Sequence, residues 1–154
     1  GSGKDKYQNI RVGVNGRLDT IQAAILIEKL DIFDEEILLR NKISTYYTKN
    51  ITSQIKKPFI PRDYTSSWAQ YSLMATSEQE RDYITSMLKN SNIPSMIYYK
   101  IPLHLQDVYK NLEYSIGDFL FSEDAAKRIF SLPMHPYLLN EEQDKILEIL
   151  NKLK

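Results

Sequence analysis

The chain has 154 residues, enough for one domain that buries about two thirds of the surface its unfolded form exposes. Its 20 basic and 20 acidic residues cancel, which excludes the strong net field that gathers nucleic acid or an anionic membrane surface. The lack of cysteine excludes disulfides, thiolate metal sites and cysteine nucleophiles, and it is consistent with a reducing cytoplasm.

The first predicted elements are a polar arm and an apolar helix. Residues 4–17 are polar and are interrupted by Gly13 and Gly16, a pattern typical of an extended arm or loop, with a short strand predicted over 10–14. Residues 18–30 carry apolar side chains on nearly every face of a helix. A helix that is apolar all round must be buried. We therefore expect this helix to pack against the rest of the molecule or against another subunit.

A second, half-exposed helix should follow. Asp34 is expected to be its N-cap, because Glu35 and Glu36 would then lie in the first turn, where the helix dipole favours negative charge. This helix runs to about Asn50, and its apolar stripe covers one face only. Residues 56–67 contain two prolines and are expected to form a connector.

The rest of the chain alternates strands and helices. Asn140 and Gln143 suit the N-cap and N3 positions of a capping box, so they mark the start of the last helix. The predicted elements after the connector are a strand over 68–76, a helix over 79–90, a strand over 95–99, a helix over 118–128, a strand over 129–132 and the helix that starts at residue 140. This order predicts an α+β fold, in which a small mixed or antiparallel sheet is packed with helices and preceded by long helices.

Motifs for independent chemistry are absent from the sequence. It contains no GxxxxGK[ST], GxGxxG or GxSxG pattern. His104 and His135 lie too far apart to form a helical metal pair and have no cysteine support, so each is expected to be structural and no metal site is predicted. No apolar run approaches the roughly 20 residues of a spanning helix, and the start lacks a signal-peptide pattern. We expect a soluble, cytoplasmic protein that binds neither nucleic acid nor a membrane.

Two pairs of residues allow two interpretations each. Asn15 and Arg17 lie where a glycine turn meets the apolar helix, and helix N-termini attract phosphate. They form either an anion site or a capped helix with a surface arginine. Tyr98 and Tyr99 could stack on a base or a sugar. Alternatively, alternation in a strand would send one tyrosine into the core and leave the other outside.

Short motifs follow one another along nearly the whole chain: Gly13-Val14-Asn15-Gly16-Arg17-Leu18-Asp19, Gln22-Ala23-Ala24, Glu28-Lys29-Leu30, Trp68-Ala69-Gln70-Tyr71, Ile93-Pro94, Tyr98-Tyr99, Pro102-Leu103-His104-Leu105-Gln106, Gly117-Asp118-Phe119, Glu123 and Leu132-Pro133-Met134-His135-Pro136-Tyr137-Leu138. In this order they resemble the C-terminal half of the DegT/DnrJ/EryC1/StrS family. These are pyridoxal-phosphate-dependent aminotransferases that act on nucleotide-linked keto sugars. Within the family, the chain is most similar to enzymes that make amino sugars for bacterial surface polysaccharide such as lipopolysaccharide.

The resemblance implies a fold-type I aminotransferase whose large domain, with the Schiff-base lysine, would precede residue 1. Such an enzyme holds pyridoxal phosphate through that lysine and an aspartate at the ring nitrogen, takes its amino group from glutamate, and forms a homodimer. Residues 1–17 would be an arm from the large domain, and residues 18–154 would be the small C-terminal domain.

The resemblance also implies roles for individual residues. Asn15 matches the asparagine that reaches the partner subunit's cofactor phosphate, and Arg17 matches an arginine near the substrate. Tyr98 and Tyr99 match an aromatic or histidine pair that lines the sugar-nucleotide pocket, and His104 follows in the same loop. The sequence departs from the family at Lys100 and Leu120, where proline is common.

Catalysis by this chain alone is not expected. A Schiff-base lysine needs phosphate anchors and a ring-nitrogen partner around it, and Lys100 has no such set in the sequence. We therefore predict no catalytic residue and no covalently bound cofactor in this chain. The leading interpretation is the C-terminal part of a nucleotide-sugar aminotransferase, inactive by itself. The alternative is a non-catalytic module for sugar-nucleotide binding or subunit association. An apolar helix over 18–30 would also favour self-association of the chain.

Overall fold

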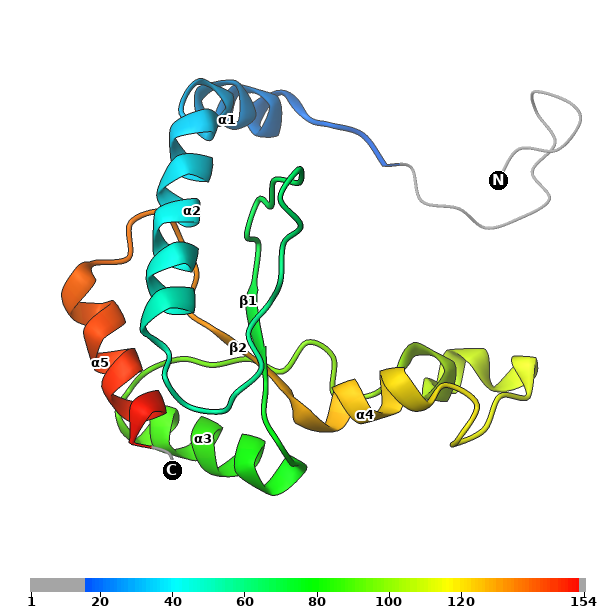
Figure 1. Cartoon of the computed structure of the whole chain (residues 1–154). Helices are drawn as coiled ribbons and strands as arrows, with labels where there is room; N and C mark the ends of the chain where they lie inside the picture. The colour runs from blue at the N-terminus through cyan, green and yellow to red at the C-terminus, as the bar shows by residue number, and fades with distance from the viewer. Residues whose placement is uncertain (1–15, 153–154) are drawn as a thin grey trace, which may run out of the picture. The chain divides into compact units, whose positions relative to one another are not determined.

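A computed structural model describes residues 16–152 (Figure 1). The chain divides into two compact units, one that ends at Asp34 and one that starts at Glu35. The arm predicted over 1–17 lies almost entirely outside the described residues, as do the strand predicted over 10–14 and Asn15. The division into an arm and a domain from residue 18 stays a prediction.

The first unit contains helix α1 (Thr20–Asp31). Asp19 is its N-cap, and the Asp19 carboxylate accepts a hydrogen bond of 2.8 Å from the Gln22 backbone N–H. The predicted helix over 18–30 is therefore present, but α1 has no buried residue. Its burial by another subunit stays a prediction.

Helix α2 (Phe33–Asn50) begins one residue after the C-cap of α1, Ile32. The expectation that Asp34 caps this helix was wrong, because Asp34 lies within it. Since a single residue separates the two helices, the chain has no room for a separate cap at Asp34. The prediction that this helix is half exposed is confirmed, because α2 buries Ile43 and Tyr47 while most of its residues are not buried.

The sheet of the second unit has two antiparallel strands, β1 (Tyr71–Met74) and β2 (Ile129–Leu132). Tyr71 faces Leu132 and Leu73 faces Phe130 in the register, and all four side chains are buried. The antiparallel sheet predicted for an α+β fold is thus confirmed, although β1 is shorter than the strand expected over 68–76.

Single bridges extend the sheet on both sides. Lys56 pairs with Met74 of β1, and Met96 pairs with Ser131 of β2. The strand predicted over 95–99 was therefore wrong in extent, because only Met96 joins the ladder. Pro94 has no N–H to donate, so the pairing cannot extend toward the start of this segment.

Three further helices complete the unit: α3 (Glu78–Asn90), α4 (Leu120–Arg128) and α5 (Asn140–Asn151). Helices α3 and α5 lie side by side, and α3 also contacts α4 and β2 (Figure 1). The core contains α-helical and strand residues together, including Tyr47, Tyr71, Leu73, Ile84, Leu88, Phe130, Ile146 and Leu150. Helix α3 contributes Ile84 and Leu88 to this core and contacts α4. The candidate site lies next to α4.

The start of α5 differs from the prediction by one residue. Leu139, not Asn140, is the N-cap, and the Glu142 carboxylate accepts a hydrogen bond of 2.9 Å from the Leu139 backbone N–H. Leucine has no side-chain acceptor, so only this half of a capping box can form. The Gln143 side chain instead donates to the Leu138 carbonyl at 3.2 Å.

Two short 3-10 helices that the sequence analysis did not predict precede α4. They are η1 (Leu103–Leu105) and η2 (Asp107–Leu112). The side chain of His104 in η1 is buried, whereas the other residues of η1 and η2 are exposed or half-buried. Both 3-10 helices extend from the core beside α4 (Figure 1), and together with α4 they form the walls of the candidate site.

Candidate functional site

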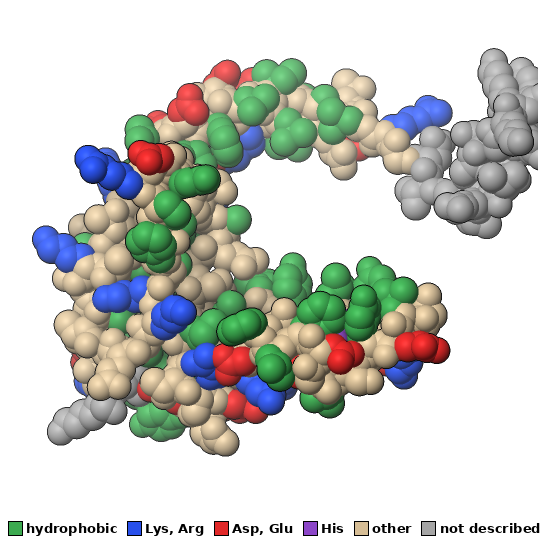
Figure 2. Space-filling model, turned by 45° about the vertical axis from the view of Figure 1, so that its right-hand side comes forward, with side chains coloured by type: hydrophobic (Ala, Val, Ile, Leu, Met, Phe, Trp, Pro, Cys, Tyr) green, Lys and Arg blue, Asp and Glu red, His purple; other side chains and the backbone are tan. Residues whose placement is uncertain are grey.

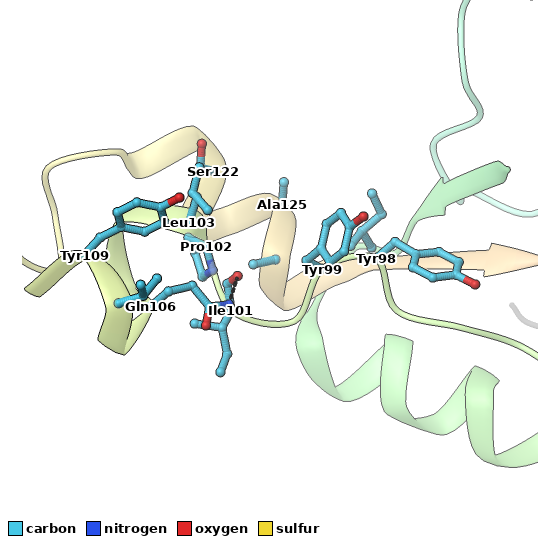
Figure 3. Close-up of a pocket in the computed structure, with 12 residues that line it drawn as sticks. Tyr98, Tyr99, Ile101, Pro102, Leu103, Gln106, Tyr109, Ser122 and Ala125 are labelled. Carbon is cyan, nitrogen blue, oxygen red and sulfur yellow. Dashed lines mark hydrogen bonds between the residues drawn. The ribbon is translucent and has the colours of Figure 1, made fainter. Parts of the chain in front are cut away.

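A cavity of about 590 Å³ lies between the segment that carries η1 and η2 and helix α4 (Figure 3). Tyr98 and Tyr99 lie at one end, and Leu103, Gln106 and Tyr109 extend along the wall that the 3-10 helices supply (Figure 3). The complete lining is Tyr98, Tyr99, Ile101, Pro102, Leu103, Gln106, Val108, Tyr109, Ser122, Ala125, Ala126 and Ile129.

The two tyrosines expected at a site both line this cavity. Their rings are 6.0 Å apart between centroids and meet edge to face at 70°. Figure 3 shows that the two side chains extend in different directions from adjacent residues. The strand alternation that would have buried one of them does not occur, because residues 98 and 99 lie outside the strands. Tyr99 is 74% exposed, so its ring is free to stack on a ligand.

The polar groups of the cavity are few and uncharged. They are the phenols of Tyr98, Tyr99 and Tyr109, the amide of Gln106 and the hydroxyl of Ser122. The Gln106 amide donates a hydrogen bond of 3.4 Å to the Ile101 carbonyl, which holds the turn before η2 (Figure 3). The sequence did not single out Gln106, Tyr109 or Ser122 as site residues. Gln106 lies between the two 3-10 helices and Tyr109 lies in η2, and such short helices leave no periodic signal in the sequence.

Uncharged walls of this kind suit a planar or sugar ring that carries hydroxyl and carbonyl groups. They do not by themselves suit pyridoxal phosphate. No lysine, carboxylate or arginine lines the cavity, so it supplies no Schiff-base partner, ring-nitrogen partner or phosphate cation. Lys100 is exposed and lies outside the lining.

His104 lies in a second, adjacent cavity of about 330 Å³, lined by aromatic and apolar side chains of the 3-10 helices and the turn before α4. Its Nε2 lies 3.2 Å from Oε1 of Glu123, and both side chains are more than 90% buried. The ring of Phe119 packs on His104 with centroids 4.7 Å apart. The expectation that His135 is structural stays a prediction.

Glu123 collects four hydrogen bonds. The Gly117 N–H donates to both carboxylate oxygens, at 2.9 and 3.0 Å, the Phe119 N–H donates to Oε1 at 3.2 Å, and His104 makes the fourth bond. Gly117 has a φ of +103°, a backbone angle that residues other than glycine rarely adopt. The backbone N–H groups of Gly117 and Phe119, followed by the contact with His104, lower the pKa of Glu123 below its ordinary value.

The lowered pKa of Glu123 leads to a prediction about the stability of the fold at low pH. A carboxyl whose pKa is lower in the folded state stabilises the fold above its unfolded pKa of about 4.3, and the contribution is lost as pH falls through the folded pKa. Glu123→Gln removes this titration. We therefore expect the free energy of unfolding of the wild type to fall faster than that of the variant below about pH 4.3, as measured by urea denaturation between pH 7 and 3. Curves that stay parallel throughout would contradict this assignment, because Asp124 and Glu148 titrate in both proteins.

Arg17 belongs to the first unit. Arg17 is exposed and precedes Asp19, the N-cap of α1. Asn15 lies outside the described residues. Among residues 16–152, no group of His, Asp and Glu side chains could hold a metal ion, and no helix is long and apolar enough to cross a membrane.

The fold matches solved aminotransferases over nearly its whole described length. The structure of a DegT DnrJ EryC1 StrS aminotransferase from Brucella abortus aligns with a TM-score of 0.83 and 44% identity, over 97% of this chain and 39% of that one. The PLP form of Spr1654 from Streptococcus pneumoniae aligns with a TM-score of 0.78 and 27% identity, over 86% of this chain and 34% of that one. The fold therefore defines the class of protein: a fold-type I aminotransferase, of which this chain covers about two fifths.

The sequence gives the family directly. The DegT/DnrJ/EryC1/StrS aminotransferase family matches residues 1–151, and the chain belongs to that family. A relative named UDP-2-acetamido-2-deoxy-3-oxo-D-glucuronate aminotransferase, from Pseudomonas aeruginosa, is 41% identical over 140 residues. These residues are 88% of this chain and 37% of the relative. The chain thus spans about two fifths of the length of the proteins that it matches.

Proposed function

We propose that this chain is the substrate-binding small domain of an enzyme that transfers an amino group, from glutamate, to the keto group of a nucleotide-linked sugar. The observation that carries the proposal is the uncharged cavity lined by Tyr98 and Tyr99, in a chain that belongs to a family of sugar aminotransferases. The Pseudomonas relative acts, by its name, on a UDP-linked keto sugar. A UDP-linked keto sugar is therefore the first substrate to test.

In this proposal the work is divided between this chain and the rest of the enzyme. Pyridoxal phosphate and its lysine belong to the large domain, while Tyr98 and Tyr99 orient the sugar nucleotide and His104 lies in the adjacent cavity. Asn15 and Arg17 contact the cofactor phosphate and the substrate across a homodimer. The enzyme is cytoplasmic, and its product serves the synthesis of surface polysaccharide such as lipopolysaccharide.

The proposal that the Schiff-base lysine lies in the large domain is tested by trapping a Schiff base. The purified chain is mixed with one equivalent of pyridoxal phosphate, reduced with borohydride and analysed by intact mass and peptide mapping. We expect scattered or absent labelling, because no lysine lines the cavity and a reactive lysine needs its pKa lowered and its aldehyde partner held in place. A single adduct on one lysine, with an aldimine absorbance band, would make this chain a catalytic unit and overturn the proposal. A full-length aminotransferase of the family is the positive control.

Tyr99 should contribute to ligand affinity rather than to folding. Its ring is 74% exposed, so Tyr99→Ala should leave the melting temperature nearly unchanged. The probe is UDP-2-acetamido-2-deoxyglucose, an analogue with a hydroxyl in place of the keto group. Loss of one aromatic stacking contact, worth about 0.5–1.5 kcal/mol, should weaken its binding by about 2- to 10-fold. Calorimetric titration measures this affinity.

The matched control is Tyr83→Ala. Tyr83 is also an exposed tyrosine, at 58%, but it lies on α3 outside the cavity lining. Equal losses of affinity in the two variants would argue against a role for Tyr99 in the site. Failure of the wild-type chain to bind the sugar nucleotide would favour a module that serves subunit association only.

A further inference from the structure

Three residues line both cavities of the candidate site. Leu103 and Tyr109 come from η1 and η2, and Ser122 comes from α4. They form the wall between the cavity that holds Tyr98 and Tyr99 and the smaller cavity that holds His104. The position of this wall sets the shape of the space that a ligand of the larger cavity would fill.

The wall is attached to the buried pair of His104 and Glu123. Leu103 precedes His104 in η1, and Ser122 precedes Glu123 in α4. The contact of 3.2 Å between the two side chains joins η1 to α4 across 19 positions of the sequence. The same Glu123 carboxylate binds the Gly117 and Phe119 N–H groups, so it also holds the turn that leads into α4.

This arrangement defines the state of the histidine. An ionised carboxylate only accepts hydrogen bonds, so Nε2 of His104 must carry the proton that it donates. In the neutral ring, Nδ1 is then an acceptor. Phe119 packs on one side of the ring, and Tyr114 packs edge to face on Phe119 with centroids 5.1 Å apart. The ring is thus fixed in both orientation and tautomer.

We propose that Glu123 is a positioning residue for the substrate cavity: by holding His104 and the 117–119 turn, it fixes the wall formed by Leu103, Tyr109 and Ser122. Glu123 does not line either cavity, so its effect on a ligand passes through these residues. Binding sites lose affinity when their walls are not held in place by supporting hydrogen bonds. The effect on the sugar nucleotide rests on the function proposed above, whereas the effect on the wall does not.

Three variants test the proposal. Glu123→Ala removes the acceptor, Glu123→Gln keeps a carbonyl acceptor without the charge, and Asp124→Ala is the control. Asp124 lies on the same helix, but its carboxylate pairs with Arg128 and it lines neither cavity. The tautomer of His104 is read from its ring ¹⁵N shifts at pH 7.5, and hydrogen exchange is measured at the amides of residues 117 and 119.

The expected result is graded. The wild type and Asp124→Ala show the Nε2–H tautomer and slow exchange, Glu123→Ala shows mixed tautomers and fast exchange, and Glu123→Gln lies between them. The affinity for UDP-2-acetamido-2-deoxyglucose should fall by about 10-fold in Glu123→Ala, the scale expected for a small displacement of a binding wall, with partial rescue in Glu123→Gln. A loss of thermal stability alone would not produce this order of tautomer and affinity.

Two outcomes would overturn the role of Glu123: an Nε2–H tautomer and slow exchange that persist in Glu123→Ala, or an affinity equal to that of the wild type. Failure of the wild type to bind the sugar nucleotide would instead count against the proposed function. In that case the ring signals of Tyr99 and Tyr109 decide the role of Glu123. Shifts in Glu123→Ala that are absent from Asp124→Ala support it, and unchanged signals refute it. Should Glu123→Ala not fold, the same comparisons are made with Glu123→Gln.

Discussion

Replacement of Phe130 by alanine is expected to lower the free energy of unfolding by about 3–5 kcal/mol. Phe130 is fully buried on β2, opposite Leu73 of β1, and belongs to the single core of the second unit. Truncation of its ring removes apolar surface from the core and leaves a cavity that the close-packed neighbours fill only in part. Because natural domains are stable by only about 5–15 kcal/mol, this loss should leave the variant barely folded at 37 °C.

The measurement is urea denaturation followed by circular dichroism, with Phe121→Ala as the control. Phe121 is 94% exposed on α4, so the same substitution there should change the free energy of unfolding by at most about 0.5 kcal/mol. Similar losses in the two variants would contradict the core that the structure assigns. The second unit carries this core, so the expected transition reports on that unit rather than on α1.

Replacement of Ile25 by aspartate is expected to abolish self-association of the chain. Helix α1 has no buried residue, and Figure 2 shows hydrophobic side chains at its surface. The exposed apolar residues of this segment are Leu18, Ile21, Ile25, Leu26, Ile27 and Leu30, which are 49–76% exposed. An exposed apolar patch of this extent is rare on monomeric proteins and favours contact with a second copy.

The size of the effect follows from the area that such a contact would bury. Each isoleucine contributes about 1.5–3 kcal/mol when fully buried, and a symmetric contact would bury one from each copy. Ile25→Asp should therefore raise the dissociation constant by about 100-fold or more, since it also places a charge in the contact. Sedimentation velocity over a range of concentrations measures the association.

Gln22→Asp is the matched control for this prediction. It introduces the same charge into the same helix, at a polar position in its first turn where aspartate is compatible with the helix dipole. The control should associate as the wild type does. A wild-type chain that sediments as a monomer at all concentrations and does not bind ANS would show that α1 does not mediate self-association.

The elements of the fold were largely predictable, because their signals are local. Asn140 and Gln143 predicted the start of the last helix to within one residue of its N-cap, Leu139. The sequence over 129–132 predicted β2 with its observed bounds. Prediction failed where a neighbouring element overrides a local pattern. Asp34 resembles an N-cap, but the immediate succession of α1 and α2 places it inside a helix.

The candidate site was predictable only in part. Tyr98 and Tyr99 were identified from their aromatic character and from the family resemblance, and the structure brings both to one cavity. Their predicted strand did not form, because only Met96 of that segment pairs with β2. Glu123 was recognised as part of a family motif, yet nothing in the sequence assigned it a partner. Its four hydrogen bonds come from residues 4 to 19 positions away.

The sequence by itself therefore determined the family, the α+β class and most of the helices, since periodicity, caps and short motifs depend on neighbouring residues. The tertiary structure decided which side chains share a cavity. The 3-10 helices have no periodic signal, and a contact between residues 19 positions apart, His104 and Glu123, joins the first of them to α4. That contact forms because burial leaves the carboxylate no water to bind, so it must find its donors within the fold.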